Sequence, residues 1–113
     1  MAIQTTTQRQ TLAVAYGAAA LWGAAYTTVP GSAAGTEVTG GSPAYVRKAL
    51  SWSGSNGVVT ASATFDIPSG TTVLGVGVHS ASAAGTYLDG ASVTSQAFAS
   101  QGTYVVTFTY TQT

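Results

Sequence analysis

Charged side chains are the scarcest feature of this sequence. Its 113 residues include three Lys and Arg and three Asp and Glu, so the formal net charge is zero with the single His neutral. The charged fraction is 5%, whereas soluble domains average about 25%. Because a net charge near zero favours association, we expect this chain to pack against copies of itself or a fixed partner. We expect no nucleic-acid partner, since phosphate contacts need a basic surface.

Cysteine is absent, which excludes disulfides, thiolate metal sites and cysteine nucleophiles. Long apolar runs are missing as well. The most apolar stretch, residues 12–25, contains two Gly and is shorter than the roughly 20 residues that cross a bilayer. We therefore expect no membrane partner.

Groups that could perform acid–base or metal chemistry are few and scattered. Such chemistry needs paired carboxylates, or a histidine with a partner. Glu37, Asp66 and Asp89 lie far apart in the sequence, and His79 is the single histidine. Asp66 stands two residues before a proline and Asp89 directly before a glycine, so we expect the first to cap a turn and the second to occupy a hairpin turn. The sequence therefore predicts no catalytic residue, metal site or cofactor, and no enzyme activity.

The N-terminal region has the pattern of one helix over about residues 6–18. The threonines at positions 5–7 are candidate N-cap residues, and an alanine-rich segment with high helix propensity follows them. Leu12, Tyr16 and Ala19 share one helix face at 3.6-residue spacing, joined by Ala13 and Ala20. We expect a half-buried helix.

From about residue 20 to residue 112 the pattern is that of β-structure. Turn residues divide this region at roughly ten-residue intervals, which is typical of a β-sandwich or barrel. Asn56-Gly57 is a strong hairpin signal, and Thr103, Val105, Thr107 and Thr109 form one face of the last strand. The expected strands are 21–29, 44–53, 58–67, 71–79, 86–88, 92–99 and 103–111, with a Gly- and Ser-rich loop at 31–43.

Two alternate glycines, Gly75 and Gly77, mark one face of the strand expected at 71–79. Glycine at such positions indicates close approach of another backbone or an aromatic ring. Together the patterns predict one domain over residues 1–113. Its fold class is mainly β, a single β-sandwich of about seven strands with one N-terminal α-helix. An immunoglobulin-like and a jelly-roll-like strand order both fit this pattern.

Two segments, residues 26–48 and 97–110, carry a recognisable motif. The first contains T-x-x-P-G at 27–31, G-x-E-V-x-G-G at 35–41 and Y-x-R-K at 45–48. These segments resemble the small virion proteins of tailed phages that infect actinobacteria, in which the same motifs follow an N-terminal helix. The resemblance covers most of the chain and implies a virion structural protein.

The leading hypothesis is therefore a non-enzymatic capsid decoration or minor capsid protein. Its location would be the virion, after assembly in the host cytoplasm, and its partners would be the major capsid protein and copies of itself. A minor tail or tail-fibre component is one alternative. A carbohydrate-binding module for host attachment is another, and it requires that Trp22 or Trp52 be exposed for stacking on sugar rings.

The candidate interface residues are Glu37, Tyr45, Arg47, Lys48 and Trp22, together with the loop 31–43. In a chain with so few charges, each retained charge is expected to pair specifically. Whether Arg47 pairs with Glu37 within its own subunit or across an interface stays open at this point.

Overall fold

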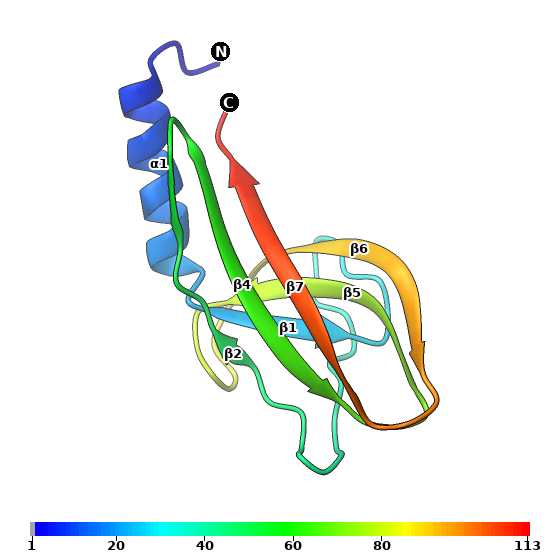
Figure 1. Cartoon of the computed structure of the whole chain (residues 1–113). Helices are drawn as coiled ribbons and strands as arrows, with labels where there is room; N and C mark the ends of the chain where they lie inside the picture. Colours follow the sequence, from blue (N-terminus) through cyan, green and yellow to red (C-terminus); the bar gives the residue numbers. More distant parts are fainter. Residues whose placement is uncertain (1) are drawn as a thin grey trace.

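The computed structural model describes residues 2–113 as one helix and seven strands in two antiparallel sheets (Figure 1). Met1, part of the predicted domain, lies outside the described residues. The elements are α1 (Thr6–Ala19), β1 (Trp22–Tyr26), β2 (Lys48–Ala49), β3 (Ser53–Ser55), β4 (Val58–Ile67), β5 (Thr71–His79), β6 (Tyr87–Phe98) and β7 (Gly102–Thr111). The first sheet has the order β2-β1-β5-β6 and the second the order β3-β4-β7. The predicted β-sandwich with an N-terminal helix is confirmed.

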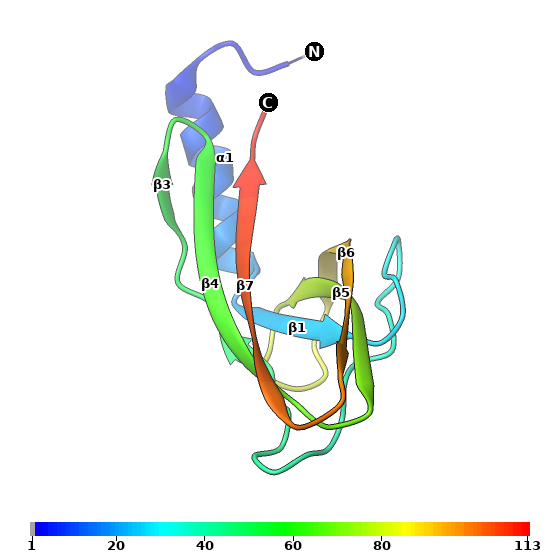
Figure 2. The same cartoon turned by 45° about the vertical axis from the view of Figure 1, so that its right-hand side comes forward.

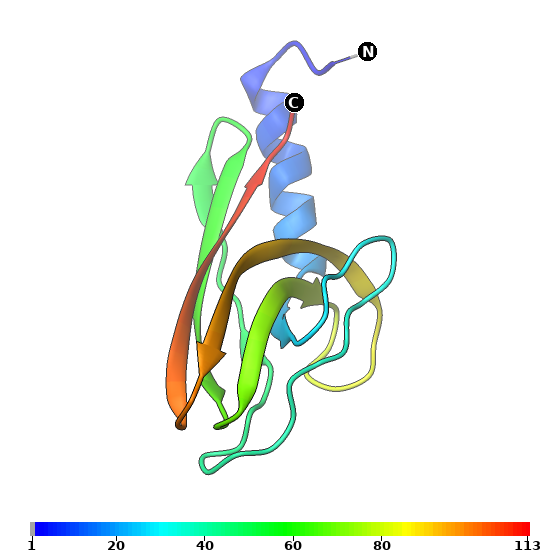
Figure 3. The ribbon, with the colours of Figure 1, turned by 90° about the vertical axis from the view of Figure 1, so that its right-hand side faces the viewer.

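Strands β4 and β7 form a long antiparallel ribbon. They pair without interruption from Val58 opposite Thr111 to Ile67 opposite Gly102. One half of the ribbon packs on the first sheet, and the other half extends beyond it beside α1 (Figures 1 and 2). The molecule is consequently elongated, with principal extents of 47 × 22 × 21 Å. The C-terminus and the start of α1 lie at the extended end (Figure 3).

The hydrophobic core lies between the two sheets, where the ribbon crosses the first sheet. Residues of β4 alternate between buried and exposed, as the sequence predicts, and Phe65 and Ile67 are fully buried. Val38 from the loop 31–43 and Val73 from β5 pack in the same cluster. The core therefore joins both sheets and one long loop.

Hydrogen-bonded caps set the ends of α1. The Thr5 hydroxyl accepts a hydrogen bond from Gln8 N at 3.3 Å, and Ala20 N donates to Tyr16 O at 2.9 Å. Satisfying the unpaired backbone groups in this way stabilises a helix end by about 1 kcal/mol. The predicted span differs from the observed helix by one residue at the C-terminal end.

Small residues hold α1 against the rest of the fold. On the predicted face Ala13 and Ala20 are buried and Tyr16 is half-buried, while Leu12 and Ala19 are exposed. The helix also buries Gly17, where a Cβ would lie 2.9 Å from Trp52 Cβ. The Trp52 indole N–H also donates to Ala20 O at 2.7 Å. The indole thus takes the place that a larger helix residue would fill.

The predicted hairpin turn at Asn56-Gly57 is confirmed. Both residues have positive φ, 57° for Asn56 and 86° for Gly57, as the tight turns that join twisted strands require. The side chain of Gln10 on α1 secures this turn. Its amide donates to Gly54 O at 3.1 Å and accepts from Gly57 N at 2.9 Å.

The predicted turn at Asp89-Gly90 is wrong. Both residues lie inside β6, where Asp89 is opposite Val78 and Gly90 is opposite Gly77. The strands expected at 86–88 and 92–99 are therefore one strand with two register shifts. A Cβ on Gly90 would lie 2.5 Å from Tyr87 Oη, so this glycine serves close packing rather than a turn.

Two further expectations are corrected. Asp66 does not cap a turn: it lies inside β4, and its carboxylate is 3.7 Å from Lys48 Nζ. The strand expected at 44–53 is reduced to β2 and β3, because the chain between them leaves the first sheet. Leu50 N donates to Leu21 O at 2.9 Å there, and the chain then turns under α1 toward the second sheet.

Candidate functional site

Three of the predicted interface residues come together beside the first sheet. Arg47 Nη2 lies 2.9 Å from Glu37 Oε1, and Arg47 Nε lies 3.0 Å from Glu37 Oε2. The Tyr45 hydroxyl donates to Glu37 Oε2 at 2.7 Å and accepts a hydrogen bond from Ala25 N at 3.0 Å. The pairing that the sequence left open is therefore formed within one subunit.

Arg47 also connects this cluster to the loop between β5 and β6. Its Nη1 group donates to Ala81 O at 3.0 Å and to Ala84 O at 2.9 Å. A guanidinium has five N–H donors, and these contacts with Glu37 and the two carbonyls use nearly all of them. The cluster thus ties β1 to two loops and leaves Arg47 little capacity for a ligand.

Electrostatics support the ionised form of this cluster. Burial alone would raise the pKa of Glu37, but hydrogen bonds from Arg47 and Tyr45 and the Arg47 charge outweigh it and lower that pKa. Burial raises the pKa of Tyr45, and its hydrogen bond to Glu37 adds to the rise. Tyr45 therefore stays a neutral donor to a carboxylate.

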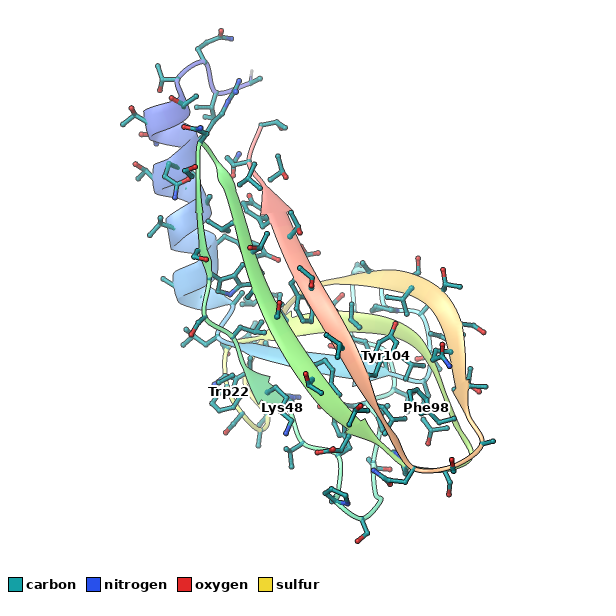
Figure 4. The ribbon with its side chains drawn as sticks, viewed as in Figure 1. Trp22, Lys48, Phe98 and Tyr104 are labelled. Carbon is teal, nitrogen blue, oxygen red and sulfur yellow. The ribbon has the colours of Figure 1, made fainter. Side chains whose placement is uncertain are left out.

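The other two predicted interface residues lie at one end of the first sheet (Figure 4). Lys48 belongs to the edge strand β2 and pairs with Asp66 of β4, so it links the two sheets. Trp22 begins β1 and is half-buried. The structure brings Glu37, Tyr45 and Arg47 into one cluster and places Lys48 and Trp22 beside it at the same sheet edge.

The outer face of the first sheet is covered by the Tyr26 side chain of β1 and by the loop that follows β1. A Cβ on Gly77 would lie 2.5 Å from Tyr26 Oη, and a Cβ on Gly75 would overlap Pro30. The close approach predicted from these two glycines is confirmed. His79, also on this face, makes a buried hydrogen bond through Nε2 with the Tyr26 hydroxyl, and burial lowers its pKa.

The outer face of the second sheet, in contrast, is bare. We name it the threonine face and define it by the exposed outward residues of β4 and β7: Val58, Thr60, Ser62, Thr64, Thr103, Val105, Thr107, Thr109 and Thr111. None of these residues is charged. Asp66, the remaining outward residue of β4, lies opposite Thr103 at one end of this face and pairs with Lys48. Val105, with 68% of its surface accessible, is the most exposed large hydrophobic residue of the described chain. The alternation of these residues can be seen in the sequence. Whether another element covers them cannot be predicted from it.

A cleft of about 300 Å³ lies between β6 and β7, and Tyr16, Trp52 and Asp89 line it. The Tyr16 hydroxyl donates to Asp89 Oδ2 at 3.0 Å, and the Tyr16 ring stacks on Tyr110 with centroids 3.8 Å apart. Trp52 is half-buried in an edge-to-face contact with Tyr16. These aromatic rings hold the helix to the ribbon and do not form an open platform.

Comparison of the chain with models of protein families, with curated proteins and with solved structures finds no match. The resemblance to phage virion proteins therefore stays a prediction. Within residues 2–113, no group of three or more His, Cys, Asp or Glu side chains could hold a metal ion. No helix in the same range has the length and apolarity needed to cross a membrane.

Proposed function

We propose that this chain is a non-enzymatic structural protein of a virion, and specifically a capsid decoration or minor capsid protein. In this role it binds and braces a shell of major capsid protein. The observation that carries the proposal is the threonine face, which is long, exposed and free of charge. A partner can bury this face without desolvating an unpaired charge.

The distribution of the few charges supports this role. Four of the six charged residues form two ion pairs inside the subunit, Arg47 with Glu37 and Lys48 with Asp66. Asp89 accepts a hydrogen bond from Tyr16, and Arg9 donates one to Ile3 O. The charges thus stabilise the subunit itself, and the one charge that borders the threonine face, on Asp66, is paired with Lys48.

A binding experiment tests this role. Particles that lack the chain are mixed with the purified protein, and bound protein is counted by quantitative mass spectrometry. We expect wild-type protein to restore both occupancy and thermal stability of the particles, and Val105→Lys to bind at least tenfold more weakly. Gln96→Lys, which adds the same charge at an exposed position of β6, should bind as wild type. Particles that lack the chain and are unchanged in stability and composition would contradict the proposal.

A tail or tail-fibre component would use the same uncharged face, so copy number separates the two locations. Hundreds of copies per virion place the chain on the shell, whereas a handful place it at the tail. The carbohydrate-binding alternative has less support. Trp22 and Trp52 are both half-buried, and the indole N–H of Trp52 is engaged by Ala20 O.

A further inference from the structure

Strand β7 is an edge strand whose outer backbone groups have no partner. Gln112 N donates to Gly57 O at 2.8 Å, which makes this position a hydrogen-bonded pair of the β4–β7 ladder. Such pairs alternate along an antiparallel ladder, so the backbone groups of even-numbered residues of β7 face β4. Those of the odd-numbered residues, Thr103 to Thr111, point away from β4. No hydrogen bond joins them to any other part of residues 2–113.

The other three sheet edges are protected. Strand β2 has only two residues and carries Lys48. Beyond β2, the edge of β1 is covered by Tyr45, whose hydroxyl accepts a hydrogen bond from Ala25 N. Strand β3 has three residues, and Gln10 of α1 binds its Gly54 carbonyl. Strand β6 carries Asp89 and two register shifts. Charges, short length, bulges and covering elements are the usual devices that prevent sheet edges from pairing with another chain.

Strand β7 has none of these devices. It is ten residues long and pairs regularly with β4, and it contains no charge, no proline and no register shift. Its residues include Thr, Val, Phe and Tyr, which favour strands. Beyond the turn to β6, the upper half of β7 separates from β6 and extends past it (Figure 2), so a further strand can approach this edge.

We propose that the free edge of β7 pairs with β7 of a second copy of this chain, in antiparallel orientation about a two-fold axis. The two three-stranded sheets then become one six-stranded sheet. Centred on Thr107, the pairing places Thr107 opposite Thr107 of the second copy, Val105 opposite Thr109, and Thr103 opposite Thr111. This register uses the outward backbone groups of every odd-numbered residue of β7.

The second copy is the occupant that the charges favour. A two-fold interface brings identical surfaces together, so a charge near the axis would meet its own sign. β7 has no charge, whereas pairing through β6 would place an Asp89 from each copy along the paired edge. In the β7 pairing, the threonine faces of the two copies join into one surface whose only bordering charges are the Asp66 side chains that pair with Lys48, and inward-facing Val106 lies opposite Phe108.

This inference deepens the proposed function by naming one partner and its surface. It rests on that function only for the expectation of self-association, and it is tested on the isolated chain. A monomeric chain that still decorates particles would overturn the pairing and leave the proposed function intact. A dimer that binds no particle would do the reverse.

Sedimentation equilibrium of the full chain is the direct test. We expect a mass of twice 11.2 kDa at concentrations below about 1 mM. Thr107→Pro should shift the dissociation constant at least tenfold, because it removes an outward N–H that β4 does not use, a position where edge strands tolerate proline. Circular dichroism checks its fold. A wild-type chain that stays monomeric at about 1 mM, or a folded Thr107→Pro protein that still dimerises, would contradict the proposal.

A charge-swap pair tests the register without relying on proline. Thr107→Lys and Thr107→Glu should each be monomeric because like charges meet at the two-fold axis, and an equimolar mixture should recover the dimer. Ser62→Lys is the matched control, since Ser62 lies opposite Thr107 on β4 of the same face. It should dimerise as wild type. Loss of the dimer in Ser62→Lys would assign the contact to the threonine face instead of the edge, and a mixture that stays monomeric would exclude the register.

Discussion

The outer faces of the two sheets differ in what covers them. The first sheet is overlaid by the Tyr26 side chain of β1 and by the loop residue Pro30, which lie against Gly77 and Gly75. Arg47 joins two neighbouring loops through Glu37, Ala81 and Ala84. Within residues 2–113 no element covers the second sheet, and its outward residues are exposed Thr, Ser and Val, with the partly buried Asp66 at one end. The chain covers the outer face of one sheet and leaves the outer face of the other exposed.

This contrast explains how a chain with so little charge is organised. Its two ion pairs lie at the edge of the first sheet. There they hold segments that have few buried apolar side chains of their own. Apart from Asp66 at its end, the ribbon of β4 and β7 has no charge, and it is held by a regular ladder and by aromatic contacts with α1. The region with almost no charge is thus also the region without cover.

The largest loss of stability should follow from Arg47→Ala. The substitution leaves the mostly buried Glu37 carboxylate without its cation and releases two loop carbonyls, so we expect the free energy of unfolding to fall by about 2–3 kcal/mol. Urea denaturation measures the change. Lys48→Ala is the control: it removes a partly exposed pair at 3.7 Å and should cost less than about 1 kcal/mol. Equal losses in both variants would show that the Arg47 cluster does not hold the loops.

Gly77→Ala should be the next most damaging change. The new Cβ would lie 2.5 Å from Tyr26 Oη and 3.0 Å from Asp89 O, so the Tyr26 ring or the strand pairing must shift, at a cost of about 1–3 kcal/mol. Gly31→Ala, where no atom lies within 4 Å of the new Cβ, should be neutral or slightly stabilising. Thermal unfolding compares the two variants, and a neutral Gly77→Ala would argue against tight cover on the first sheet.

Much of this fold follows from local sequence signals. The helix caps, the Asn56-Gly57 turn and the alternation along β4 are local, and the structure confirms the elements that they predict. The errors arise where contacts distant in sequence override a local signal. Gly90 is needed because Tyr87 and Pro30 lie against it, and not because the chain turns there.

The candidate site shows the same division. Glu37, Tyr45 and Arg47 stand out in the sequence, and they do cluster. Their role inside the subunit depends on Ala81 and Ala84, which carry no signal because only their backbone carbonyls take part. The bare threonine face could not be predicted either, since strand alternation indicates two faces but does not show which of them another element covers.

Acid should destabilise the covered sheet through His79. Burial holds the pKa of His79 below its usual value, so the unfolded chain takes up a proton near pH 6.5 while the folded protein does not. Stability should therefore be full above pH 6.5 and decline below it, with a slope of at most about 1.4 kcal/mol per pH unit. Denaturation between pH 7.5 and 5 measures this slope, and His79→Gln should abolish it. An unchanged slope in the variant would assign the effect to another group.

Below about pH 4.5 we expect a second loss of stability, caused by protonation of Glu37. The pKa of Glu37 is lower in the folded protein than in the unfolded chain. The ionised carboxylate therefore contributes fully to the free energy of unfolding above the pKa of the unfolded chain, and this contribution is lost as the pH falls through the pKa of the folded protein. Glu37→Gln should remove this acid phase while leaving the His79 phase in place. Acid titration of both variants separates the two phases.

The smallest effect on stability should come from the threonine face. Val105→Lys changes an exposed side chain with no covering neighbour, so the free energy of unfolding should stay within about 0.5 kcal/mol of wild type. Chemical denaturation checks this, in parallel with the binding experiment on particles. A destabilisation as large as that of Gly77→Ala would contradict this expectation. It would show that Val105 contributes to the stability of the second sheet.

Amide hydrogen exchange along β7 tests most directly whether this bare ribbon is an assembly surface. In dilute solution the even-numbered amides, Tyr104 to Tyr110, should exchange slowly and the odd-numbered amides, Thr103 to Thr109, should exchange fast. At high protein concentration we expect the odd-numbered amides to become protected as well. An alternating pattern that is the same at every concentration would contradict the account.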